Sequence, residues 1–125
     1  MTTSSPGRAA PATSFPEPLE FRGPESQVTI YPEDCLQGLP RLAPECVDVV
    51  VTSPPYNLGI KYQTYKDTLS RRDYLDWLDD WAAAVTRVLA ARGSLFLNMG
   101  GKPRDPWVPF EVAGVMRRHL VLQNV

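Results

Sequence analysis

The sequence is poor in the residues that build metal sites and disulfides. Histidine occurs once, as His119, and cysteine twice, as Cys35 and Cys46, with no Cys-x-x-Cys pair. Because this set lacks the spacing of metal ligands, we expect no metal site and two reduced, partly buried thiols. No stretch has the character of a signal peptide or a transmembrane helix, which predicts a soluble, cytoplasmic protein.

An excess of positive charge is also missing. Lysine and arginine total 13 and aspartate and glutamate 14, so the net charge is −1 and the pI is about 5.8. This balance excludes a protein that binds nucleic acid through its overall charge, and any such contact needs a local patch. With 125 residues, 43% of them hydrophobic, the chain suits one small globular domain whose core needs no disulfides.

The first 26 residues show no hydrophobic periodicity. Proline, serine, threonine and alanine dominate this segment. It cannot bury enough apolar surface to offset the entropy lost on ordering. We therefore predict a disordered tail over residues 1–26 and a folded domain over residues 27–125.

Strand and helix patterns alternate after this tail, which predicts an α/β fold with a parallel sheet flanked by helices. The segment 47–52 is so apolar that we expect it to be buried on both faces. Ser70 and Asp73 resemble a capping box before a long amphipathic helix that ends at Gly93. The predicted strands are residues 28–31, 47–52, 94–99 and a last strand that begins at residue 120. The predicted helices are a short helix after Asp34, a long helix over residues 71–92, and a helix that is capped by Asp105 and runs to about His119.

A rigid corner follows the strand at residues 47–52. Pro54 and Pro55 have fixed φ angles, and Ser53 and Pro54 are held extended because each precedes a proline. Proline offers a carbonyl acceptor but no N–H donor, Ser53 adds a hydroxyl oxygen, and Tyr56 adds a flat ring. The corner therefore presents preset acceptors beside a surface for stacking, at the edge of a parallel sheet where ligands bind.

These groups suit a planar heterocycle that carries an amino group. The ring could stack on Tyr56, while the two amino hydrogens bond to the Ser53 side chain and the Pro54 carbonyl. The lone pair of such an amine is delocalised into the ring. Acceptors that hold both hydrogens favour a pyramidal, nucleophilic nitrogen, which could attack a methyl group.

The stretch "TSPPYN" after an apolar strand resembles the catalytic motif of amino-group DNA methyltransferases, which form N4-methylcytosine or N6-methyladenine. The flanking "EDCLQGLPRLAPECVDVVV", "YLDWLDDWAAAVTRVLAARGSLFLNMG" and "HLVLQNV" are similar to the elements around that motif, so the resemblance covers residues 28–125. It implies a partial Rossmann-like methyltransferase fold, S-adenosylmethionine as cofactor, and double-stranded DNA as substrate with the target base flipped out.

The resemblance also implies roles for single residues. The catalytic corner that holds the base is matched by Ser53, Pro54, Pro55 and Tyr56. Serine at position 53 slightly favours cytosine over adenine as the target base. Asp34 matches an acidic residue that contacts the adenosine part of the cofactor, but it could equally cap a helix. For Asn57 we favour a turn residue over a role next to the site.

A basic stretch follows the corner and could contact DNA. Lys61, Lys66, Arg71 and Arg72 lie among tyrosines there, a mixture that suits phosphate contacts and base stacking. The alternative is an ordinary solvated loop. Arginines at the start of a helix oppose its dipole, which favours a reason other than helix formation for Arg71 and Arg72.

The sequence departs from the family pattern in one respect. No Phe-x-Gly-x-Gly loop, which holds the methionine end of the cofactor, is present. The sequence therefore looks like the N-terminal portion of a methyltransferase that stops within a strand at Val125, and the missing C-terminal half is an expected partner. Two alternatives remain open: methylation of a protein glutamine or an RNA base, and a remnant without catalysis that binds DNA or a partner weakly.

Overall fold

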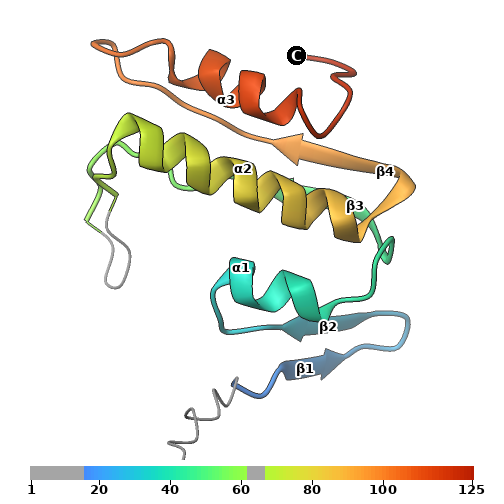
Figure 1. Ribbon diagram of the computed structural model, residues 1–125. Helices are drawn as coiled ribbons and strands as arrows, with labels where there is room; N and C mark the ends of the chain where they lie inside the picture. Colours follow the sequence, from blue (N-terminus) through green and yellow to red (C-terminus); the bar gives the residue numbers. More distant parts are fainter. Residues whose placement is uncertain (1–15, 62–66) are drawn as a thin grey trace, which may run out of the picture. The chain divides into compact units, whose positions relative to one another are not determined.

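The computed structural model describes residues 16–61 and 67–125 (Figure 1). The chain divides into two compact units, Met1–Asp34 and Cys35–Val125, and each is described by itself. The corner and the long helix both belong to the second unit, so that unit carries the candidate site.

The first unit contains an antiparallel hairpin of β1 (Leu19–Arg22) and β2 (Gln27–Ile30). Side chains alternate along both strands, so the apolar residues share one face and the polar residues the other. The apolar face is formed by Leu19, Phe21, Val28 and Ile30.

The hairpin corrects two expectations. The predicted disordered tail to residue 26 is wrong for Leu19–Arg22, because this short alternating segment pairs with β2 across a turn that contains Pro24, a residue favoured at the second position of such turns. The strand predicted at residues 28–31 does form, but its partner in the described chain is β1, in antiparallel orientation. Residues 1–15 lie outside the described residues.

The second unit contains the parallel sheet that the alternating pattern predicts. β3 pairs with β4 in parallel, and α2 connects them, which makes a βαβ unit. The register places Val51 opposite Phe96 and Thr52 opposite Leu97. The elements of this unit are α1 (Cys35–Gly38), the 3-10 helix η1 (Leu39–Arg41), β3 (Val47–Thr52), α2 (Arg71–Val88), β4 (Leu89–Leu97) and α3 (Val108–Met116).

Helix α2 begins where the sequence predicts. The side chain of Ser70 accepts a hydrogen bond from the N–H of Asp73 at 3.1 Å, which is the expected cap. The helix ends at Val88, before Gly93, because Leu89 already pairs with Val47 and the chain enters β4. The helix buries one apolar face, as its amphipathic pattern predicts, and the buried residues of α2 are Tyr74, Leu78, Trp81, Ala82, Val85 and Val88.

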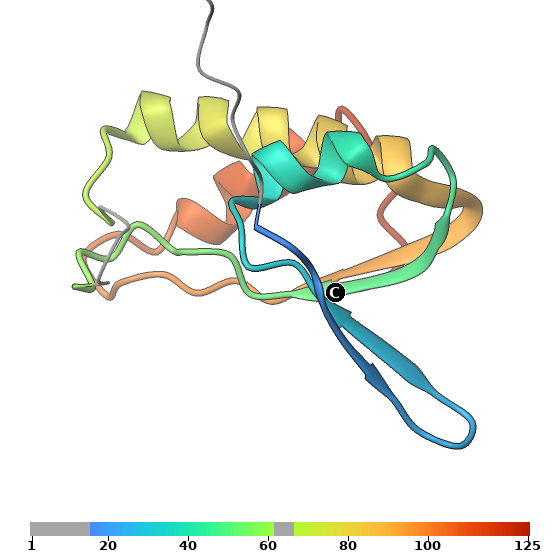
Figure 2. The same cartoon turned by 90° about the horizontal axis from the view of Figure 1, so that it is seen from below.

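One face of the β3–β4 sheet is covered by helices. In Figure 2, α2 and α3 lie on the same side of the two strands. Val50 and Leu95 point to the core between helices and sheet. Val49, Val51 and Phe96 are 55%, 76% and 61% exposed. The expectation that β3 is buried on both faces is therefore wrong for the described residues, because the helices pack on one face.

Helix α3 is shorter than predicted. It spans Val108–Met116 with Trp107 at its N-cap position and a proline in its first turn, so Asp105 does not cap it. The side chain of Asp105 instead binds Arg71. The strand predicted from residue 120 does not form: residues 120–125 have no regular structure, and Leu122 is 74% exposed.

A cluster of charges joins the last turns of this unit to α2. Asp79 Oδ1 lies 2.6 Å from Nε2 of His119 and 2.9 Å from Nη2 of Arg118. The hydrogen bond to His119 and the positive charges of Arg118 and His119 hold the pKa of Asp79 below its ordinary value, although desolvation opposes them. The ionised carboxylate is therefore favoured in the folded state.

This pKa shift predicts a loss of stability in acid. A carboxyl whose pKa is lowered by folding stabilises the protein above its unfolded pKa of about 3.9, and this stabilisation disappears as the pH falls through the lower folded value. We expect Asp79→Asn to remove part of the acid-side slope of unfolding free energy, measured by urea unfolding between about pH 2.5 and 6. Asp80→Asn, an exposed neighbour on α2, is the matched control, and equal slopes in the two variants would contradict the assignment.

The described residues bear on several smaller expectations. Cys35 and Cys46 are both exposed, where partly buried thiols were expected, because neither side chain belongs to the core that α2 and α3 form. Within residues 16–61 and 67–125 no group of three or more potential metal ligands occurs. The helices in these ranges are all too short or too polar to cross a membrane.

Candidate active site

The proline corner lies at the carboxyl end of β3. β3 ends at Thr52, whose carbonyl accepts a hydrogen bond from the N–H of Asn98 at 2.9 Å. This bond continues the parallel pairing one step beyond β4. The carboxyl ends of parallel strands lie at the same edge, so the residues after β3 and after β4 meet there.

The two prolines are fixed against α2. Pro54 is buried and Pro55 is half-buried. The hydroxyl of Tyr74, a fully buried residue of α2, donates a hydrogen bond to the carbonyl of Pro55 at 2.8 Å. A buried phenol needs such a partner, so the core of the unit and the backbone of the corner are held by the same side chain.

Ser53 and Tyr56 are connected through Asn98. The side-chain nitrogen of Asn98 donates to Oγ of Ser53 at 3.1 Å and to the hydroxyl of Tyr56 at 2.9 Å. The structure therefore brings together the serine and the tyrosine that the sequence analysis assigns to the base. Sequence reasoning missed Asn98, which lay inside a predicted strand.

Gly100 lies against the ring of Tyr56. A Cβ atom at this position would lie 3.0 Å from Cε2 and 3.1 Å from Cδ2 of the ring, closer than most such contacts. A side chain here would press on Tyr56, so glycine allows the ring to occupy its place. The absence of a side chain at Gly100 therefore leaves room for the ring of Tyr56.

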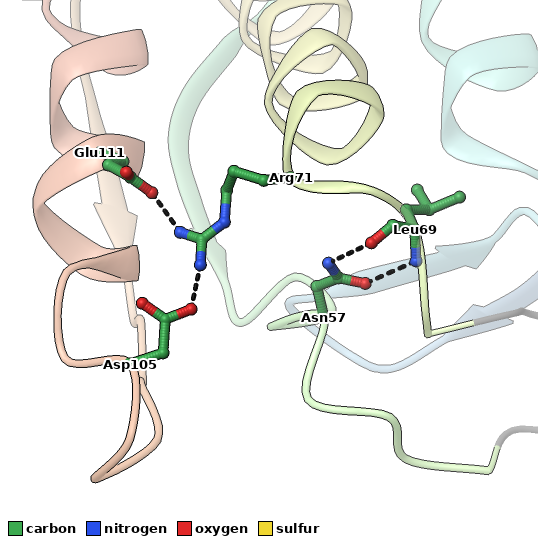
Figure 3. Close-up of polar contacts among 5 residues, drawn as sticks. All are labelled: Asn57, Leu69, Arg71, Asp105 and Glu111. Carbon is green, nitrogen blue, oxygen red and sulfur yellow. Dashed lines mark hydrogen bonds and ion pairs between the residues drawn. The ribbon is translucent and has the colours of Figure 1, made fainter.

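Asn57 turns the chain after the corner. Its φ angle is 56°, in the left-handed region that asparagine tolerates. Its side chain bonds to the backbone of Leu69 in both directions: Nδ2 donates to the carbonyl at 2.9 Å, and Oδ1 accepts from the N–H at 2.8 Å (Figure 3). The interpretation of Asn57 as a turn residue is confirmed.

A buried carboxylate, that of Asp67, stabilises the same turn through hydrogen bonds to its backbone. Asp67 is 2% exposed. Its Oδ1 accepts from the N–H of Asn57, and its Oδ2 accepts from the N–H groups of Leu58 and Ile60, each at 3.0 Å. Its carbonyl accepts from the N–H of Gly59 at 2.8 Å. Asp67 therefore satisfies backbone donors that a turn of this kind leaves unpaired, a role that no local sequence pattern indicates.

Arg71, a predicted DNA contact, is engaged within the chain. Its guanidinium binds the carboxylates of Asp105 and Glu111 (Figure 3). These ion pairs connect the start of α2 to α3 and to the loop before it. They give a structural reason for an arginine at this helix start, in contrast to the expected contact with DNA.

The other predicted DNA contacts form fewer bonds within the chain, or lie outside the described residues. Arg72 is exposed and makes a 3.7 Å ion pair with Asp76, one helical turn away. Lys61 is exposed. Lys66 lies outside the described residues. Exposed ion pairs of this kind are weak, so Arg72 can exchange Asp76 for another anion at little cost.

Asp34, the predicted cofactor contact, is the last residue of the first unit. It is exposed and directly precedes the first residue of α1. Its role in binding adenosine stays a prediction, as does its role as a helix cap.

A small pocket lies next to the turn. Its volume is about 200 Å³, and it contains none of the four corner residues. Ligand pockets are usually larger, about 300 Å³ or more. We therefore assign the candidate site to the corner, which is open to solvent at Ser53. The pocket is lined in part by Asn57, Leu69, Arg71, Tyr74, Lys102 and Asp105.

Within residues 16–61 and 67–125 we identify no complete cofactor site. The glycine-rich loop that would hold the methionine end is missing from the sequence, and the place beside Gly100 is filled by Tyr56. The described residues therefore place Ser53, Tyr56 and Asn98 together at the corner, and the expectation that this corner holds a base stays a prediction.

Comparison with known proteins identifies the family of this chain. A family model described as DNA methylase matches residues 47–124, a range that contains the corner and Asn98. The type II methyltransferase M.ScaI of Streptomyces caespitosus is 37% identical over 78 residues, which are 62% of this chain and 25% of that protein.

Two further relatives are also methyltransferases. The type II methyltransferase M.MjaVI of Methanocaldococcus jannaschii is 40% identical over 73 residues, 58% of this chain and 36% of that protein. The DNA adenine methyltransferase YhdJ of Escherichia coli K12 is 33% identical over 95 residues, 76% of this chain and 31% of that protein. The chain thus spans between a quarter and just over a third of the length of these relatives.

Proposed function

The chain belongs to the DNA methylase family, and on this premise we propose that it methylates the exocyclic amine of a base in DNA. The base is cytosine, at N4, or adenine, at N6, and it is flipped out of a duplex to reach the corner. The observation that carries this proposal is the hydrogen-bonded set of Ser53, Asn98 and Tyr56 beside the rigid carbonyls of Pro54 and Pro55.

Each corner residue has a task in this proposal. Tyr56 stacks on the base, and Ser53 Oγ and the Pro54 carbonyl accept the two amino hydrogens. Pro55 has its carbonyl bound to Tyr74 and keeps the corner rigid. With both hydrogens held, the lone pair of the amine is less delocalised into the ring, and the developing positive charge faces acceptors. The amine nitrogen would take the methyl group that a bound sulfonium donor supplies, leaving that donor as a thioether, and would release one proton to solvent.

The remaining components follow from the family. The methyl donor is S-adenosylmethionine, with Asp34 as a contact to its adenosine part. Lys61 and Arg72 are exposed and could bind phosphates of double-stranded DNA, as could Lys66. Because the chain spans a limited share of its relatives, the rest of the cofactor site belongs to a further segment or a second chain.

The proposal is tested by methyl transfer to DNA. The chain is incubated with S-adenosylmethionine labelled in its methyl group and with duplex DNA, both alone and with the unmatched part of M.ScaI added as a second chain. The DNA is then digested to nucleosides and examined by mass spectrometry. We expect label in N4-methyldeoxycytidine or N6-methyldeoxyadenosine. Label on cytosine C5, transfer only to RNA or protein, or no transfer in either mixture would overturn the proposal.

A further inference from the structure

Asn98 makes one hydrogen bond to the end of β3 and two to the corner. Its backbone N–H bonds to Thr52 at the end of β3, and its side-chain nitrogen bonds to Ser53 and to Tyr56. The backbone bond fixes where the side chain starts. The two side-chain bonds then connect residues that are separated by both prolines of the corner. Such an arrangement holds Ser53 and Tyr56 at a set distance from each other.

The hydrogen inventory of these bonds determines the direction of the Ser53 hydroxyl. A side-chain amide nitrogen carries two hydrogens, and Asn98 uses one on Ser53 and the other on Tyr56. A hydroxyl has one hydrogen and two lone pairs. Because one lone pair of Ser53 Oγ already faces a donor, its own hydrogen must point away from Asn98. Ser53 therefore turns one donor and one free lone pair away from Asn98.

We propose that Asn98 is a positioning residue that orients the Ser53 hydroxyl to read two adjacent atoms of the base, an inference that rests on the proposed function. The free lone pair of Ser53 Oγ accepts an amino hydrogen, and the hydroxyl hydrogen donates to the ring nitrogen beside that amine. Cytosine N3 and adenine N1 are both acceptors in this position. Thymine and guanine carry a carbonyl and a ring N–H there, so the pattern rejects them.

The contact between Asn98 and Tyr56 is tested first, without measuring enzymatic activity, by nuclear magnetic resonance on the whole chain. In the wild type we expect nuclear Overhauser effects between the Asn98 amide hydrogens and the Tyr56 ring. Asn98→Asp has nearly the same shape but lacks both donors, and we expect it to shift the Cζ resonance of Tyr56. Asn124→Asp, the same change at an exposed position near the end of the chain, should leave that resonance unchanged.

Two results of this measurement would overturn the inference. One is a wild-type spectrum without contacts between the Asn98 amide and Tyr56. The other is an Asn98→Asp variant that folds, by its thermal melt, and keeps the wild-type resonance of Tyr56. If Asn98→Asp fails to fold, the wild-type contacts decide alone.

The reading of the base is tested with DNA in which the ring nitrogen is replaced by C–H, as in 3-deazacytosine or 1-deazaadenine. Loss of one hydrogen bond should slow methyl transfer by the wild type about 10-fold. Asn98→Asp should lower kcat about 100-fold with KM for DNA unchanged, and it should no longer distinguish the two DNAs.

Failure of this inference and failure of the proposed function give different results. Wild-type transfer with an equally active and equally selective Asn98→Asp variant would overturn the positioning role and leave the function intact. No transfer by the wild type under any condition would overturn the proposed function, and with it the proposal that Ser53 recognises the base. The spectroscopic contacts would still show whether the Asn98 amide lies against Tyr56.

Discussion

Asp67→Ala should lower the free energy of unfolding by about 3 kcal/mol, because it leaves several part-buried N–H groups without an acceptor. In the wild type the Asp67 carboxylate accepts from Asn57, Leu58 and Ile60 while being almost fully buried. All three bonds are part-buried, so water can replace the lost acceptor only in part. Urea unfolding followed by circular dichroism measures the change.

Two control variants separate the buried bonds from the loss of a charge. Asp67→Asn keeps one oxygen acceptor, and we expect it to lose roughly half as much stability as Asp67→Ala. Asp80→Ala removes an exposed carboxylate of α2 and should change stability by no more than about 0.5 kcal/mol. A loss below about 1 kcal/mol in Asp67→Ala would show that these backbone groups do not depend on its carboxylate.

Tyr56→Ala should reduce methyl transfer at least about 100-fold. Stacking of a base on an aromatic side chain contributes about 1–3 kcal/mol, and this variant also loses the partner of Asn98. Initial rates at saturating DNA and cofactor measure the effect. Tyr56→Phe keeps the ring and loses only the hydroxyl, so its activity should lie between the wild type and Tyr56→Ala.

The matched control for this prediction is Tyr31→Ala, which removes an exposed tyrosine far from the corner in sequence. It should retain the wild-type rate. Pro54→Ala should resemble Tyr56→Ala, because the acceptor carbonyl loses its rigid support. Full activity of both corner variants would mean that the base binds elsewhere.

Local patterns were sufficient to predict the βαβ unit. The apolar periodicity of α2, its cap at Ser70 and the strand before the corner are all properties of neighbouring residues, and the structure confirms them. The expectation that both faces of β3 are covered could not be checked from the composition of the strand. Apolar residues on a strand show that it can be buried, but only the placement of helices decides whether both faces are.

The supports of the corner could not be predicted for a different reason. Asn98 and Asp67 lie 45 and 10 residues from the atoms they hold, and Arg71 lies 34 residues from Asp105. No spacing rule within a single helix or strand relates such partners, because they meet only after the sheet and helices have packed. The corner itself was recognisable because its rigidity is encoded in consecutive residues.

The hairpin β1–β2 was missed because its first strand is four residues long and follows a proline-rich stretch. Composition averaged over the whole segment hides a short alternation of this kind. The pairing with β2 supplies what the segment lacks by itself, namely partners for its backbone and for its apolar side chains.

The bonds of Asn57 to Leu69, together with those of Asp67, close the chain segment between them at its base. Closing a chain segment costs entropy that rises by only about 0.6 kcal/mol for each doubling of its length. The two ends can therefore stay joined, with Asn57 keeping its place directly after Tyr56, when the number of residues between the ends changes.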